Sequence, residues 1–164
     1  MDIFLLRHGR AEDAGPGMSD ADRKLTKKGY EEMAAVSHWI ASQRMPIDLI
    51  ASSPFVRAQE TAEIVAKALN AQDRLVNWKT LAPGGNPDIV CRQISRHPDY
   101  ASILLVGHEP LLSSLISHII AGDDHAAIIM TKGALAKIQD FSYTGRPSGS
   151  LHWLLTAKQM AGMK

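Results

Sequence analysis

The sequence of 164 residues contains almost no cysteine and no long apolar run. Cys91 is the only cysteine, which excludes an intrachain disulfide and a cluster of thiolate metal ligands. Arg7 interrupts the first apolar run early, so the amino terminus lacks the long apolar stretch of a secretory signal peptide. No other run reaches the roughly 18 apolar residues that a membrane span needs. We therefore expect a cytoplasmic protein that does not bind a membrane.

An excess of charge of either sign is missing too. The 18 Lys and Arg residues nearly balance the 17 Asp and Glu residues, and the formal net charge is +1. A broad basic face for nucleic acid is therefore not expected, and any anion-binding site must be local. Repeats, low-complexity tracts and interdomain linkers are not found in the sequence. With 45% hydrophobic residues, the whole chain (1–164) is predicted to fold as one domain.

What the sequence does contain is an alternation of short apolar runs and amphipathic segments. The apolar runs that predict buried strands lie at residues 3–6, 47–51, 75–78 and 102–106. The final third predicts two further strands, 134–141 and 151–156, separated by a turn-rich stretch at 145–149. This order is typical of an α/β fold with three layers, α/β/α. Its central sheet should be mostly parallel, with an antiparallel hairpin at one edge.

Three of the predicted helices begin at recognisable sequence signals. Thr26 is a predicted N-cap, and Gly29 in the first turn costs helix stability, which suggests a close backbone approach there. Ser53 and Pro54 predict a cap followed by the first helical residue, so that Arg57 lies in the first turn. Pro110 likewise predicts a first helical position.

Polar residues follow three of the predicted strands. Arg7 and His8 come after the first strand, Arg57 after the second and His108 after the fourth. In a parallel sheet all carboxyl ends lie at one edge, where such folds bind ligands. Two helix amino termini should point to the same edge and favour an anion there. The four residues are therefore predicted to converge on a phosphoryl group.

The residue types at this edge suit phosphoryl transfer. Arginine stays charged and presents a fork of donors that matches phosphate oxygens, which suits Arg7 and Arg57. A neutral imidazole can attack phosphorus through one nitrogen while the other donates to the backbone, and His8 is the predicted nucleophile. His108, if protonated, would stabilise charge on the transferring group. Positioning and electrostatics supply most of such catalysis, so we predict no metal and no cofactor.

At these residues the chain resembles the histidine phosphatase superfamily, whose fold is phosphoglycerate mutase-like. The features that carry the resemblance are Arg7-His8-Gly9, Leu25-Thr26 followed by Gly29, Ser53-Pro54 with Arg57 and Thr61, and Gly107-His108. The short length without insertions is most similar to the SixA-type phosphohistidine phosphatases. The resemblance implies that His8 is transiently phosphorylated and that water then releases phosphate. It also implies that Arg7, Arg57 and His108 line the phosphate pocket.

One departure from the superfamily bears on the substrate. Many members place an acidic proton donor after the third strand, but no Asp or Glu occurs between Asp73 and Asp88. An alkoxide leaving group needs a proton, whereas the imidazole of a phosphohistidine can be protonated beforehand. This favours phosphohistidine on a signalling protein as the substrate. The alternatives are a small phosphate ester, with Glu109 or water as the acid, and a non-catalytic phosphate-binding module.

Two further residues allow two interpretations each. Arg10, where many relatives carry an acidic or amide residue, could add positive potential at the pocket or could be a solvated loop residue. Glu109 could orient His108 or serve as an acid, or it could be a favourable carboxylate at a helix amino terminus. Residues 10–24 are rich in Gly, Asp and Pro and are predicted to form an exposed loop.

Overall fold

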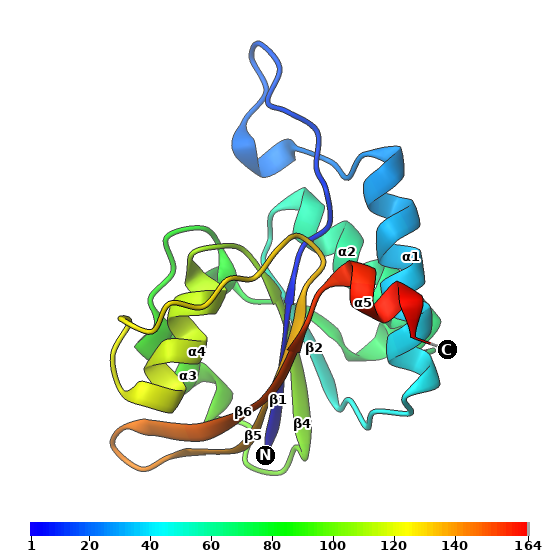
Figure 1. Cartoon of the computed structure of the whole chain (residues 1–164). Coiled ribbons are helices and arrows are strands. Elements are labelled where there is room, and N and C mark those ends of the chain that lie inside the picture. The colour runs from blue at the N-terminus through cyan, green and yellow to red at the C-terminus, as the bar shows by residue number, and fades with distance from the viewer. Residues whose placement is uncertain (164) are drawn as a thin grey trace.

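A six-stranded sheet runs through the centre of the computed structural model, which describes residues 1–163 (Figure 1). Its strands lie in the order β3-β2-β4-β1-β5-β6. Their bounds are Asp2–Arg7 for β1, Leu49–Ser52 for β2, Leu75–Asn77 for β3, Ser102–Gly107 for β4, Leu135–Tyr143 for β5 and Pro147–Leu155 for β6. The first four strands are mutually parallel, and β5 and β6 form an antiparallel hairpin at the edge. The predicted sheet is thereby confirmed.

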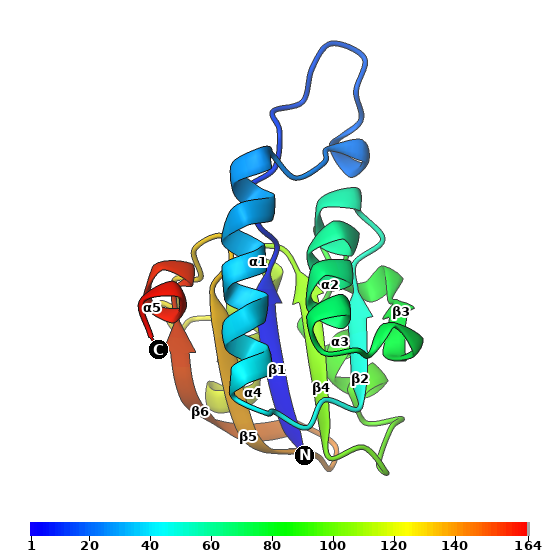
Figure 2. The ribbon, with the colours of Figure 1, turned by 90° about the vertical axis from the view of Figure 1, so that its right-hand side faces the viewer.

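Helices cover both faces of this sheet and complete the three layers (Figures 1 and 2). The helices are α1 (Lys27–Ser42), α2 (Val56–Ala68), α3 (Pro87–Ile94), α4 (Leu111–Ala121) and α5 (Ala157–Gly162). Helices α1, α2 and α5 lie on one face, and α3 and α4 lie on the other. Within the described residues, no helix is both long enough and apolar enough to span a bilayer.

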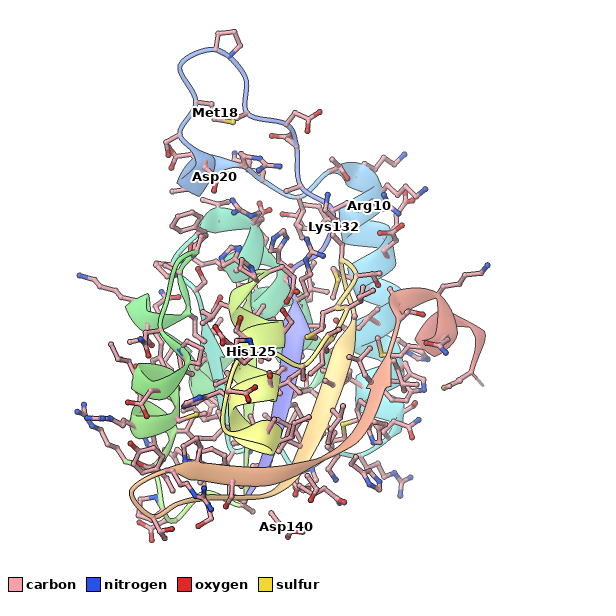
Figure 3. The ribbon with its side chains drawn as sticks, turned by 60° about the vertical axis from the view of Figure 1, so that its left-hand side comes forward. Arg10, Met18, Asp20, His125, Lys132 and Asp140 are labelled. Carbon is pink, nitrogen blue, oxygen red and sulfur yellow. The ribbon has the colours of Figure 1, made fainter. Side chains whose placement is uncertain are left out.

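The segment between β1 and α1 extends past the carboxyl edge of the sheet as an exposed loop (Figures 1 and 3). Its base is closed, because Ala11 and Leu25 form an isolated antiparallel bridge and Glu12 N donates to the Lys24 carbonyl at 2.9 Å. A short 3₁₀ helix, Asp20–Asp22, turns the loop back toward the sheet edge. The prediction of an exposed loop is confirmed, and its closed base gives the loop a defined path.

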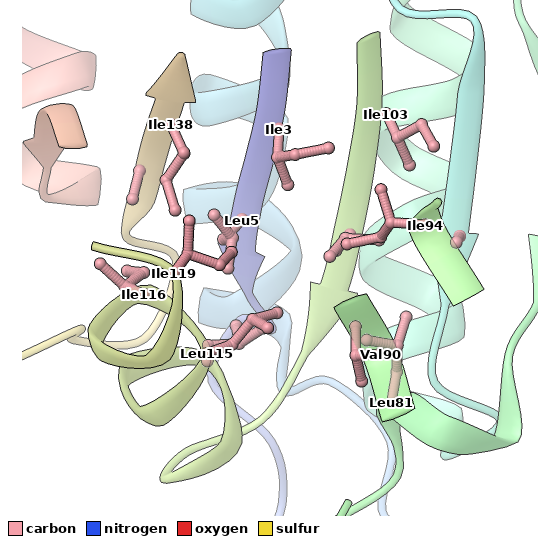
Figure 4. Packing of buried hydrophobic residues seen from close by; sticks show 14 of the residues in the cluster. Ile3, Leu5, Leu81, Val90, Ile94, Ile103, Leu115, Ile116, Ile119 and Ile138 are labelled. Atoms are coloured by element: carbon pink, nitrogen blue, oxygen red, sulfur yellow. The ribbon is translucent and has the colours of Figure 1, made fainter. Parts of the chain in front are cut away.

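Burial on both faces of the sheet explains why the strands appear in the sequence as continuous apolar runs. Side chains of a strand alternate between the two faces, so in β1 Ile3 and Leu5 pack toward α3 and α4 (Figure 4), while Phe4 and Leu6 pack toward α1 and α2. Both faces are covered by helices, and all four side chains are at most 2% exposed. A parallel strand buried on both sides has no polar face to reveal an alternation.

Two predicted helix starts are shifted in the structure. Helix α2 begins at Val56 and not at Pro54, because Ser53 Oγ accepts from Phe55 N at 3.2 Å and lies 2.8 Å from His108 Nε2, which places Ser53 in a turn before the helix. Pro110 is the N-cap of α4 rather than its first residue. Both helices nevertheless begin at the carboxyl edge of the sheet.

The last part of the chain differs from the prediction in two respects. Strand β6 already begins at Pro147, so the predicted turn at 145–149 is too long. Helix α5 was not predicted, although Thr156 and Gln159 form a capping box at its start. Its six residues carry too little periodicity for a helix to be inferred from apolar spacing alone.

The predicted close approach at Gly29 is confirmed. Thr26 caps α1 by accepting from Gly29 N at 3.0 Å, and a Cβ atom on Gly29 would overlap with the carbonyl oxygen of Arg10. That same carbonyl accepts from Thr26 N at 3.0 Å. Only glycine therefore lets the start of α1 lie directly against the chain that leaves β1.

We expect Gly29→Ala to destabilise the protein by about 1–3 kcal/mol, because the added methyl group must push α1 away from a backbone atom. Alanine gains up to about 1 kcal/mol in helix propensity, which only reduces this loss. Urea unfolding measures the difference. Gly162→Ala in α5 is the matched control, since nothing surrounds that position. Equal unfolding free energies for Gly29→Ala and the wild type would show that the contact is not tight.

Candidate active site

The sheet brings the polar ends of three neighbouring strands together. In β1 and β4, which pair in parallel, Arg7 lies opposite Gly107, and His8 N donates to the Gly107 carbonyl at 3.1 Å. On the other side of β4, Ser53 N donates to the Val106 carbonyl at 2.9 Å. Backbone pairing thus places the residues that follow β1, β2 and β4 side by side at the carboxyl edge.

His8 is buried, and the partners of its ring nitrogens determine the tautomer. Its Nδ1 lies 2.7 Å from the carbonyl oxygen of Gly9, which can only accept. Its Nε2 lies 3.2 Å from Nε of Arg57, which can only donate. The ring proton must therefore be on Nδ1, and Nε2 carries a lone pair. Gly9 N in turn donates to Thr61 Oγ1 at 3.1 Å, which fixes the backbone that holds the ring.

The surroundings of His8 also keep its ring neutral. Burial lowers the pKa of His8 from its ordinary value of 6.5 to about 4, and the positive charges of Arg57, Arg7 and Lys132 lower it as well. The hydrogen bond to the Gly9 carbonyl acts in the opposite direction and is outweighed. At neutral pH the ring therefore keeps its Nε2 lone pair, as a nucleophile must.

Each of the three nitrogens of the Arg57 guanidinium donates a hydrogen bond. Besides the bond to His8, Nη1 donates to the Asp20 carbonyl at 2.5 Å and Nη2 donates to Asp20 Oδ2 at 3.0 Å. Oδ1 of the same carboxylate accepts from Arg23 Nη1 at 2.8 Å. Arg57 is 5% exposed, and its side chain also packs against the Phe55 ring, 5.1 Å from the ring centroid. The long loop thereby supplies the partner of a buried cation.

Arg7 and His108 complete the set of four predicted residues. Arg7 Nη1 donates to the Met130 carbonyl at 2.7 Å, and the ring of His108 lies 4.9 Å from that of His8 between centroids. Within residues 1–163, neither Arg7 Nε nor His108 Nδ1 has a hydrogen-bond partner, although both atoms are buried. An unpartnered buried polar atom is costly. We expect a bound phosphoryl group to reduce that cost.

The pKa of His108 bears on the role that a protonated ring would have. The pKa of His108 is lowered to about 3, mainly by burial and also by the nearby His8 and Arg57, while Asp20 acts in the opposite direction. The ring of His108 is therefore neutral at neutral pH. A phosphoryl group brings negative charge and should raise the pKa of His108.

One pocket of about 330 Å³ contains these groups. Its lining residues are Arg7, His8, Asp20, Arg23, Arg57, Pro83, His108, Glu109 and Lys132. All four residues predicted from the sequence line it, which confirms their convergence; their catalytic roles stay predictions. Sequence reasoning missed Asp20, Arg23 and Lys132, which lie in loops without periodicity, and it missed the contact of Ser53 with His108.

The contacts of Glu109 and Arg10 bear on the two interpretations that the sequence allows for each residue. Glu109 Oε1 accepts from Ser113 N at 3.0 Å, which makes Glu109 a carboxylate at the amino terminus of α4, while it also lines the pocket. Arg10 pairs with Glu32 at 3.0 Å and is exposed. It lines a neighbouring cavity of about 610 Å³ that shares Arg7 and Lys132 with the phosphate pocket, and in Figure 3 Arg10 lies close to Lys132.

The tautomer and charge of His8 can be tested by NMR. At pH 6 we expect a neutral ring with the proton on Nδ1, because the folded protein lowers the pKa of His8 to about 4. Long-range ¹⁵N–¹H correlation spectra report both quantities along a pH titration. The urea-unfolded chain is the reference, and its histidines should titrate near about 6.5. A ring protonated on Nε2, or half-protonated at pH 6 in the folded protein, would be incompatible with this geometry.

The fold and the cluster of arginines and histidines define a class of protein. Residues 3–82 match the histidine phosphatase superfamily (branch 1). The chain is 30% identical over 128 residues to the phosphohistidine phosphatase SixA homolog of Haemophilus influenzae. The matched region covers 73% of this chain and 77% of that protein. The chain belongs to the histidine phosphatase superfamily and is a phosphatase.

Within this class the chain is similar to SixA proteins over nearly its whole length. It is 28% identical over 158 residues to the phosphohistidine phosphatase SixA of Escherichia coli K12. The matched region covers 95% of this chain and 94% of that protein. A solved structure of the protein histidine phosphatase SixA with tungstate matches with a TM-score of 0.85 and 28% identity, covering 96% of this chain and 98% of that one. The resemblance seen in the sequence and the predicted fold are thereby confirmed.

Proposed function

We propose that this protein removes phosphate from phosphohistidine on a signalling protein through a phosphohistidine intermediate at His8. The observation that carries the proposal is the state of the His8 ring. Nδ1 donates to the Gly9 carbonyl, and Nε2 keeps a lone pair within the pocket. A neutral, oriented imidazole beside cationic groups is the arrangement that nucleophilic attack on phosphorus requires.

The proposed reaction has two displacements. In the first, the Nε2 lone pair of His8 forms a bond to phosphorus, and the bond from phosphorus to the leaving nitrogen breaks with its electron pair on that nitrogen. In the second, water forms a bond to phosphorus and passes a proton to a phosphoryl oxygen, while the bond from phosphorus to Nε2 breaks and its electron pair returns to Nε2. Arg7, Arg57, Lys132 and the ring of His108 would bind the phosphoryl oxygens and stabilise their charge.

The substrate follows from what the leaving group needs. The segment after β3 contributes Pro83 to the pocket and no acid. An alkoxide would therefore leave without a dedicated proton donor, whereas an imidazole that is already protonated leaves as a neutral ring. The similar SixA proteins are named phosphohistidine phosphatases, which supports the same substrate class. A signalling protein is proposed because histidine phosphorylation is a transient mark.

Turnover of two substrates tests this proposal. We expect the kcat/KM for a protein phosphorylated on histidine to exceed that for 4-nitrophenyl phosphate by about tenfold or more, a difference typical of a site matched to one leaving group. Phosphate release measures both rates. Hydrolysis of the ester without hydrolysis of the phosphohistidine would reject the proposed substrate. Phosphate binding without turnover of either substrate would instead indicate a binding module.

A phosphatase for a small phosphate ester is the second candidate, and one observation favours it. Glu109 lines the pocket and is the nearest carboxylate to His108 in sequence, so it could protonate a leaving oxygen. Its Oε1 already accepts from Ser113 N, so this oxygen is engaged at the start of α4 and not with a leaving group. Glu109→Gln should therefore leave ester hydrolysis slow and little changed if phosphohistidine is the substrate.

A further inference from the structure

The loop between β1 and α1 brings a carboxylate to the phosphate pocket. Asp20 lines the pocket together with His8 and Arg57, and Figure 3 shows the residue at the sheet-facing end of the loop. Its Oδ2 accepts from Arg57 and its Oδ1 from Arg23. The Asp20 side chain is 53% exposed, whereas that of Arg57 is 6% exposed. The carboxylate thus stands between a buried cation and the open mouth of the pocket.

This carboxylate is ionised and has acceptor capacity to spare. The hydrogen bond from Arg23 lowers the pKa of Asp20, and the hydrogen bond from Arg57 lowers it as well. An ionised carboxylate offers about four acceptor positions, and the two arginine side chains occupy two of them. Asp20 can therefore accept a further hydrogen bond from a ligand, but it has no proton to give to a leaving alkoxide.

The leaving groups of the two candidate substrates differ in their charge and in whether they carry a hydrogen-bond donor for Asp20. A phosphohistidine protonated on its second ring nitrogen is an imidazolium, which carries positive charge and an N–H donor. When its bond to phosphorus breaks, the electron pair neutralises the ring and the N–H stays in place. An ester instead develops negative charge on oxygen, which a neighbouring carboxylate repels.

We propose that Asp20 determines leaving-group specificity: its carboxylate accepts a hydrogen bond from the imidazolium N–H of phosphohistidine and disfavours leaving groups that depart as oxyanions. This inference rests on the proposed phosphohistidine function and adds a residue and an interaction to it. It assigns the loop of residues 10–24 a direct role in substrate choice, while the sheet edge supplies the nucleophile and the phosphate ligands.

Asp20→Asn tests the inference, because asparagine keeps the size of the side chain and removes its charge. Asp22→Asn is the matched control: Asp22 belongs to the same 3₁₀ helix, accepts from Ser19 Oγ at 2.9 Å and does not line the pocket. The quantity measured is the ratio of kcat/KM for free phosphohistidine to kcat/KM for phenyl phosphate. A charge-assisted hydrogen bond implies that Asp20→Asn lowers this ratio about tenfold to a hundredfold, and Asp22→Asn should not change it.

Each other result overturns the inference. Equal losses on both substrates, together with weaker inhibition by inorganic phosphate, would mean that Asp20 only positions Arg57. Equal gains would mean that Asp20 competes with phosphate for Arg57. Either of these two results would leave the proposed function unaffected, provided that the wild type hydrolyses phosphohistidine. If the wild type does not hydrolyse phosphohistidine at all, the proposed function fails and the role of Asp20 fails with it.

Discussion

His8→Ala should abolish phosphatase activity, with kcat/KM falling by about 10³-fold or more, because an alanine side chain cannot form the covalent intermediate that we propose at His8 Nε2. In the wild type, quenching with alkali during turnover of a labelled phosphohistidine donor should trap a phosphoenzyme that is stable to alkali and is lost when the sample is then treated with acid. The variant should trap none. Rapid quench followed by electrophoresis under alkaline conditions measures both.

Two controls make this result specific. His38→Ala replaces an exposed histidine on α1 and should keep wild-type activity. His8→Asn keeps a polar group of similar reach at the buried position, so it separates loss of the nucleophile from loss of packing. A labelled phosphoenzyme of normal amount in His8→Ala would assign the nucleophile to another residue.

Arg57→Lys should cost about a hundredfold in kcat/KM, although it keeps the charge. A lysine ammonium cannot reproduce the fork with which Arg57 reaches His8 Nε2, the Asp20 carbonyl and the Asp20 carboxylate at once. Arg57→Ala should cost about 10³-fold, since the charge that we propose to stabilise the phosphoryl oxygens is lost as well. Steady-state kinetics with a phosphohistidine substrate measures both.

The pKa of His8 distinguishes an electrostatic role of Arg57 from a merely structural one. Burial is the largest cause of the low pKa of His8, and the charge of Arg57 contributes to it. Arg57→Ala should therefore raise the pKa of His8 from about 4 toward its ordinary value of 6.5, which an NMR titration detects. Arg92→Lys, at an exposed position in α3, is the control for the conservative exchange. An unchanged pKa of His8 in Arg57→Ala would show that the two side chains are not coupled.

The convergence of the four pocket residues could be predicted because it depends on a general property of parallel sheets. Arg7 is the last residue of β1, the other three residues follow the ends of strands, and parallel strands end at one edge. The prediction did not need the strand order, which depends on packing between distant segments. Burial on both faces made the strands visible as apolar runs, and β4, which is buried along its whole length, is the clearest case.

The parts that could not be predicted depend on contacts between distant residues. Ser53 looks like a helix cap in the sequence, but its hydroxyl lies against His108, 55 residues away, and the helix begins later. Asp20 sits in a loop without periodicity, and its importance comes from Arg57, 37 residues away. Local signals describe local hydrogen bonds well, as at Thr26, and they contain no information about such long-range partners.

The pairing at the end of β1 positions His8 independently of the loop that follows it. Arg7 N donates to the Ala134 carbonyl on one side, and His8 N donates to the Gly107 carbonyl on the other. These bonds fix the backbone at His8 without any help from residues 10–24. A change in this loop that keeps the contacts between Asp20 and Arg57 should therefore leave His8 in place, so substrate preference can be engineered without moving the proposed nucleophile.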